Sequence, residues 1–219
     1  EKTQFAISGN YFNDKGIIYN QDFTRYTFRI NLDHQVTKKI KVGTSMLAVY
    51  STRNGENFNP YGGSLAENPL GKPYDDEGNL IFLPTNDGAR TNPIAEIVPG
   101  AQVDLTKRMR IFSSIYGEWN ILDGLKYRVN FGPDLNNRRI VRFVGSETNV
   151  RRYGAPTAYQ FNEYQFNYTL ENILMYNKRF NDKHNLGVTA LHSFQKDDLE
   201  QNFTNVTGIP AESQQFYNL

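Results

Sequence analysis

The sequence predicts an all-β chain in which antiparallel up-and-down strands form a slice, about seven strands wide, of a transmembrane β-barrel. Three observations support this fold class. About seven segments alternate apolar and polar residues, no segment has the apolar period of a helix, and the connections are short and long in turn. Short turns on one side and long loops on the other are typical of outer-membrane barrels.

In chain order, the alternation predicts strands at residues 4–11, 25–33, 40–50, 109–121, 125–132, 164–176 and 186–194. The second is the clearest, because every second residue from Tyr26 to Leu32 is apolar and the residues between them are polar. The fifth carries Lys126 and Arg128 on one face, which excludes burial on both faces. Ser113 and Asn172 interrupt the apolar face in the fourth and sixth segments.

The connections predict sidedness. Residues 36–39, 122–124 and 180–183 read as tight polar turns, and the Asp123-Gly124 pair supplies the positive φ that a hairpin turn needs. The long connections are rich in Gly, Pro, Asn and Asp. They are expected at residues 13–22, 52–107, 139–162 and in a tail from Lys196. We therefore expect the turns to face the periplasm and the loops, including the long one at 52–107, to face outward.

The composition agrees with this fold. The chain has a mean hydropathy of −0.62 and no run near the roughly twenty apolar residues of a spanning helix. Only alternate residues of a barrel strand meet lipid, so a low mean is compatible with a barrel. The chain has no Cys, which fits an oxidising periplasm but is allowed anywhere. Candidates for interfacial aromatic girdles are Tyr11, Tyr26, Tyr50, Tyr127, Tyr164 and Tyr176, although ordinary sheet-face aromatics are an equal alternative.

The chain is expected to be a fragment. It begins inside a strand pattern without a targeting segment, and seven strands are an odd number and too few to close a barrel. We therefore interpret residues 1–219 as a partial barrel with no plug domain. Such a slice would expose two strand edges and should not be stable as a soluble monomer.

Several motifs in this order resemble the barrel of SusC-like (SusC/RagA) TonB-dependent outer-membrane transporters. Each motif alone is only weakly specific, and their order and spacing over nearly the whole chain carry the resemblance. The matching segments are Tyr11–Ile18, Asp22–Asp33, Ile40–Gly43, Thr91–Ala95, Gly124–Gly132, Glu171–Tyr176 and Lys183–Leu186.

The resemblance implies a non-enzymatic transporter in the outer membrane of a Gram-negative bacterium. Such proteins import glycans, oligosaccharides or peptides with energy from TonB, and a SusD-like surface lipoprotein caps the barrel. The implied partners are that lipoprotein, TonB, outer-membrane lipid and the oligosaccharide or peptide substrate. The TonB-coupling parts would lie outside this segment.

Catalysis, cofactors and metals find no support in the sequence. There is no Cys nucleophile, phosphate-binding loop or nucleophile elbow. His184 and His192 share a strand face but lie about 26 Å apart at strand rise, too far to hold one metal. The acidic run from Asp75 to Asn79 lacks the spacing of an EF-hand and is better explained as a hairpin tip.

Two groups are candidates for contacts. Flat aromatic rings beside Asn and Gly suit sugar rings or a lid protein, while packing inside the loop is the favoured alternative. These aromatic residues are Phe58, Tyr61, Tyr74 and Phe82. A basic group near the outer end of a strand could bind lipopolysaccharide phosphates or an anionic substrate, although a solvated charge run is the simpler explanation. It comprises Arg138, Arg139, Arg142, Arg151 and Arg152, and the net charge of +1 argues against nucleic acid.

Two other functions stay open at this point. A soluble or surface-attached all-β carbohydrate-binding module would need its apolar strand faces to meet in a sandwich. A passive porin-like channel would share the barrel but work without TonB.

Overall fold

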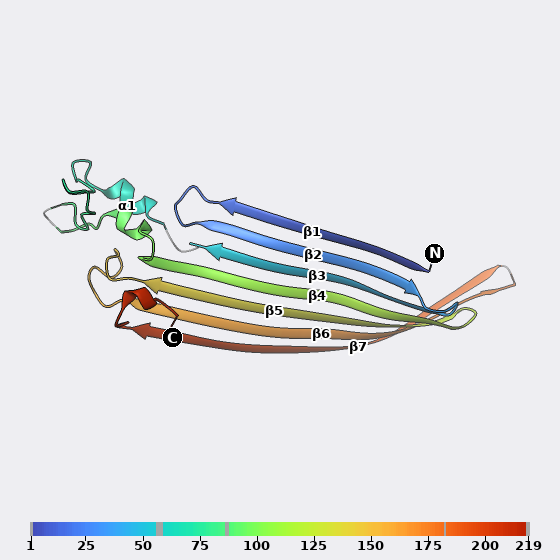
Figure 1. Cartoon of the computed structure of the whole chain (residues 1–219). Coiled ribbons are helices and arrows are strands. Elements are labelled where there is room, and N and C mark those ends of the chain that lie inside the picture. Colours follow the sequence, from blue (N-terminus) through green and yellow to red (C-terminus); the bar gives the residue numbers. More distant parts are fainter. Residues whose placement is uncertain (1, 56–58, 86–87, 182, 218–219) are drawn as a thin grey trace.

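The computed structural model describes residues 2–55, 59–85, 88–181 and 183–217, and its strands form a single antiparallel sheet. The seven strands pair in chain order, each with the next, as Figure 1 shows. They are β1 (Thr3–Lys15), β2 (Asp22–Gln35), β3 (Ile40–Asn54), β4 (Gln102–Leu122), β5 (Leu125–Val144), β6 (Thr157–Phe180) and β7 (His184–Thr207). The predicted fold class is confirmed.

Loops and turns occupy opposite ends of the sheet. The long β3–β4 connection carries the short helix α1 (Tyr61–Ala66) and the 3-10 turn η1 (Pro93–Ile97), and η2 (Glu212–Gln214) follows β7. Figure 1 shows these segments together at the end away from the tight turns. At the turn between β4 and β5, Gly124 has φ +82°, as the Asp-Gly pair predicts. Among the described residues, no helix is long and apolar enough to cross a membrane.

The strands run further into the loop end than the alternation indicates. β3 continues to Asn54 and β4 begins at Gln102, so the connection predicted at 52–107 is shorter at both ends. The largest difference is in β7, because the stretch predicted as a tail from Lys196 is strand as far as Thr207. There Lys196, Asp198 and Glu200 occupy the positions that continue the apolar face, so the apolar period that marks the earlier part of the strand is lost.

The strand registers place most of the large apolar side chains on one face of the sheet, which we call the apolar face. Tyr11, Tyr26 and Tyr50 are direct partners across β1, β2 and β3, with ring centroids 5.1 and 6.5 Å apart. The same face continues to β7 through the direct partners Ile115, Phe131, Leu170 and Phe194. Asn172 does lie on this face, and the Tyr127 hydroxyl donates a hydrogen bond of 2.5 Å to its Oδ1.

The successive turns are staggered along the sheet. The last pair before the β2–β3 turn is Gln35–Lys41, and the direct partners of this pair on the following strands lead to Ile173 of β6. The β6–β7 hairpin continues seven residues further, because its last pair is Phe180–His184. This offset is roughly 23 Å along the strands across roughly 19 Å of sheet, a tilt of about 50°. Figure 1 shows the β6–β7 hairpin projecting beyond the other turns. A tilt of this order brings the turns of a barrel to one level.

A small core covers the apolar face at its loop end. Val141, Phe143 and Ala158 on β5 and β6 are almost fully buried beneath Ile209 and Phe216 of the segment after β7. Nearer the turns, the same face exposes large apolar side chains, such as Phe28 and Phe194. The apolar face is therefore open near the turns and is covered by the chain itself at its loop end.

Candidate functional site

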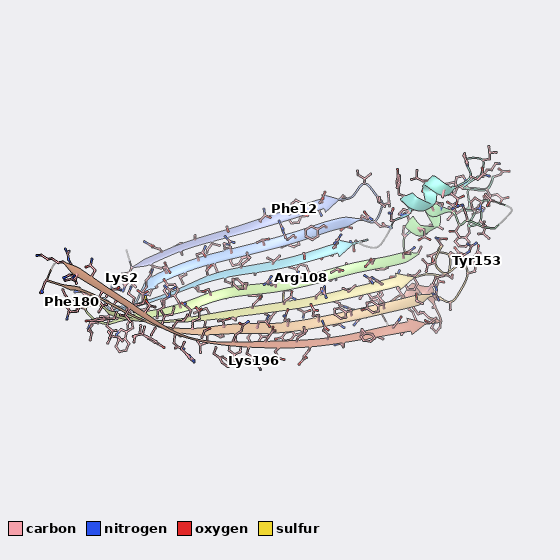
Figure 2. All side chains as sticks on the ribbon, turned by 180° about the vertical axis from the view of Figure 1, so that it is seen from behind. Lys2, Phe12, Arg108, Tyr153, Phe180 and Lys196 are labelled. Carbon is pink, nitrogen blue, oxygen red and sulfur yellow. The ribbon has the colours of Figure 1, made fainter. Side chains whose placement is uncertain are left out.

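Two loops at the loop end of the sheet form one packed unit, which we call the cap and define as residues 59–85 and 88–101 together with 145–156. Phe82 is 7% exposed and meets the Tyr153 ring edge-on, with centroids 4.6 Å apart. The Arg152 guanidinium donates hydrogen bonds to the carbonyl oxygens of Gly88 and Ala89. Figure 2 shows Tyr153 in this cap, at the end of the sheet opposite Phe180.

Asn92 organises the first loop from inside. Its side-chain amide donates to the carbonyl oxygens of Pro73 and Ile81, at 2.9 Å each, and its Oδ1 accepts from the Ile94 N–H at 3.0 Å. The last bond caps the N-terminus of η1. The residue is only 2% exposed, so its amide is shielded from water and depends on these partners for its hydrogen bonds.

A second set of bonds joins the loops near the strands. Thr91 Oγ1 donates to Asn149 Oδ1 at 3.0 Å. The Glu96 carboxylate accepts hydrogen bonds from the Asn149 backbone N–H and from the Gln102 side chain. These bonds link the start of β4 to both loops, so the cap is attached to the sheet through more than its chain connections.

The candidate aromatic contacts separate in the structure. Tyr61 and Tyr74 are 61% and 45% exposed, and their rings are open to a ligand or a lid protein. Phe82 is packed inside the cap, which agrees with the internal-packing alternative. Phe58 lies outside the described residues.

The five candidate arginines do not form one group. Arg138 and Arg142 lie on the face opposite the apolar one, which we call the polar face, and they pair with Glu163 at 3.1 Å and Asp104 at 3.4 Å. Arg139 points to the other side of the sheet, because neighbouring strand residues alternate. The remaining two, Arg151 and Arg152, donate to carbonyl oxygens within the cap.

Arg139 has a cationic neighbour instead. Lys107 is its direct partner across β4 and β5, and both side chains are exposed. Like charges placed directly opposite on paired strands repel each other. The pair lies between Met109 and Leu105 on the apolar face of β4, so it interrupts the apolar residues of that face just before the loop-end core. Of the five candidate arginines, Arg139, together with Lys107, is the one that we continue to predict as a contact to an anionic lipid.

The polar face carries a groove that the strand pattern alone did not identify. Leu47 and Phe112 are direct partners on this face, and Val49 follows on β3. With Ser51, Arg108 and Arg110 they line a groove of about 380 Å³. A usable signal was present in the sequence, because Leu47, Val49 and Phe112 are apolar at positions where the alternation expects polar residues.

Nearer the turns, the polar face is closely packed with charged side chains. The Tyr116 hydroxyl donates to Asp33, Lys41 lies 3.1 Å from the other oxygen of that carboxylate, and the Arg128 guanidinium lies 4.0 Å from the centroid of the Tyr116 ring. Gly43 lies directly opposite Tyr116 and leaves room for its ring. This part of the face is held together by ion pairs and hydrogen bonds rather than by an apolar core. In the described parts of the chain, no group of three or more potential metal-ligating side chains occurs.

A continuous apolar face, a polar face with paired charges, tilted strands and loops at one end together define a segment of a transmembrane barrel wall. The comparisons with known proteins agree. The chain is 26% identical over 227 aligned residues to "TonB-dependent receptor P3" of Formosa agariphila and 27% identical over 225 residues to "TonB-dependent receptor P26" of the same bacterium. Each alignment covers the whole chain and 22% of the relative, so the chain spans about a fifth of their length.

Solved structures give the same fold. The chain superposes on the RagAB peptide importer in its "closed-closed" state with a TM-score of 0.76 and 16% identity, covering 97% of this chain and 25% of that one. The "open-open" state gives a TM-score of 0.74. No family model matches the chain. The resemblance to the barrel of TonB-dependent receptors is thus confirmed, and relatives named as receptors and importers agree with a non-enzymatic role.

Proposed function

We propose that this chain forms part of the wall and outer cap of an outer-membrane transporter that imports nutrients with energy from TonB. The observation that carries the proposal is the continuous apolar face of one staggered sheet, in a chain that aligns over its whole length with TonB-dependent receptors. In this proposal the apolar face meets lipid, the polar face lines the lumen, and the cap faces outward.

The substrate class in the proposal is an oligosaccharide or a peptide, taken up together with a SusD-like surface lipoprotein. Support for the lipoprotein comes from the fold similarity to RagAB and from the exposed rings of Tyr61 and Tyr74 on the cap. Support for peptides comes from the same similarity, because RagAB is a peptide importer.

The carbohydrate-binding alternative has less support. A sandwich needs two sheets whose apolar faces meet, whereas the strands of the described chain belong to one sheet. That alternative would give a monodisperse soluble domain without detergent, which the exposed apolar face argues against.

The test uses the native full-length protein in its own bacterium. We expect it to fractionate with the outer membrane, to migrate as a heat-modifiable species, and to support substrate uptake that stops when TonB is deleted. Recovery from the soluble cytosol would overturn the membrane location. Uptake that persists without TonB would instead indicate a passive channel.

A further inference from the structure

The groove on the polar face combines apolar surface with an uncompensated positive charge. Phe112 is 48% exposed, and it lies beside Leu47 and Val49 on a face that otherwise carries mainly polar side chains. Leu47 and Val49 are half-buried, and apolar side chains that gather around an exposed ring on a mainly polar face mark a contact surface. A ligand in the groove should therefore present an apolar group to these three residues.

The charges beside the apolar side chains are not equivalent. Arg110 is neutralised, because its guanidinium donates two hydrogen bonds to the Asp134 carboxylate, at 2.9 and 2.6 Å. Arg108 donates from Nε to the uncharged amide oxygen of Asn136 at 2.7 Å, which orients the guanidinium without neutralising it. In the described part of the structure, no carboxylate forms an ion pair with Arg108.

Neighbouring residues increase the positive potential at this end of the groove. Arg25 is the direct partner of Ser51, which is in turn the direct partner of Arg108, so both guanidinium groups come from one row of the polar face. Arg138 follows Arg108 in that row and is paired with Glu163. The row therefore carries three arginines and one carboxylate, an arrangement that favours a bound anion.

We propose that this groove is a substrate subsite for the C-terminal end of an oligopeptide whose last residue is apolar. The Arg108 guanidinium binds the terminal carboxylate, and the last side chain packs on Leu47, Val49 and Phe112. A peptide terminus suits the groove because its carboxylate and its side chain leave the same carbon atom. An acidic sugar surrounds its carboxylate with hydroxyl groups and would leave the apolar side chains unmatched. The inference rests on the proposed import function and selects the peptide class within it.

The experiment measures binding of a fluorescent hexapeptide ending in leucine to the purified full-length transporter, as the free acid and as the C-terminal amide. The wild type is expected to bind the acid about tenfold more tightly, the size of a charge-assisted hydrogen bond. Arg108→Gln should remove this preference, and Arg108→Lys should keep part of it. Arg128→Gln is the matched control, because Arg128 lies on the same face beside Glu118 and far from the groove.

The apolar part of the subsite has its own readout. Phe112→Ala should weaken binding of the leucine-ending peptide several-fold and leave a serine-ending peptide nearly unchanged. Equal binding of acid and amide by the wild type, or a preference that survives in Arg108→Gln, would overturn the subsite. Those results would leave the proposed function standing, since TonB-dependent uptake is measured separately in cells. Heat-modifiable migration of each variant shows that it has folded.

Discussion

Removing the Asn92 side chain should open the cap while leaving the sheet intact. The Asn92→Ala substitution deletes three hydrogen bonds, two from Nδ2 to the carbonyl oxygens of Pro73 and Ile81 and one from the Ile94 N–H to Oδ1. Each bond contributes about 1 kcal/mol net, and the Asn92 amide that makes all three is buried. We expect local opening of the cap to become easier by about 3 kcal/mol, or more than a hundredfold.

Hydrogen exchange with mass spectrometry, applied to the full-length protein, measures this opening in peptides that cover residues 73–82 and 92–97. Protection should fall there and stay unchanged in β4 and β5. The control is Asn68→Ala, which removes one exposed bond from the Leu70 N–H in the same loop. If these peptides are as strongly protected from hydrogen exchange in Asn92→Ala as in the control variant, the buried amide does not hold the cap together.

Three further predictions concern other parts of the chain. Gly43→Val should lower the stability of the barrel by about 1–3 kcal/mol in a urea titration, because a Cβ at this position overlaps the Tyr116 ring. Gly132→Ala should lower the stability less, because the atom nearest to a Cβ there is 3.7 Å away. Hydrogen bonds from Asn79 lower the pKa of Asp75, so the turn that they form should be fully stable above the ordinary value of 3.8. The turn should loosen as the pH falls through the lowered pKa. Hydrogen-exchange protection of the turn, relative to the intrinsic rate at each pH, that stays unchanged at low pH would contradict this. Replacing Arg139 and Lys107 together by Gln should reduce the lipopolysaccharide that copurifies with the protein, and an unchanged amount would remove the lipid contact.

The central part of each strand was predictable because one face of the sheet is apolar and the other is mainly polar, which produces an alternation with period two. From Tyr26 to Leu32, each apolar residue lies on the apolar face and each polar residue on the other, and the registers with β1 and β3 confirm this. The outer ends were not predictable by that route. Beyond Phe194, charged residues take the positions of the apolar face at Lys196, Asp198 and Glu200, so the period of two is lost although the strand continues to Thr207.

The candidate site was predicted less well, for two physical reasons. Sequence proximity suggested one arginine group, yet the period of two in a strand places Arg138 and Arg139 on opposite faces. The contact between Phe82 and Tyr153 joins residues from different loops, and no local pattern in either loop predicts it. Strand alternation reports which face a residue occupies, whereas loop packing depends on long-range contacts.

The contacts between the two loops of the cap limit which loops can be exchanged between related proteins. Because Phe82 contacts Tyr153 and Arg152 bonds to the opposite loop, neither loop keeps its shape if the other is exchanged. A chimera that receives only the β3–β4 loop of a relative would lack the matching contacts on the other loop. The two loops therefore have to be exchanged as a pair, and grafts that aim to alter specificity should transfer residues 55–101 and 145–156 together.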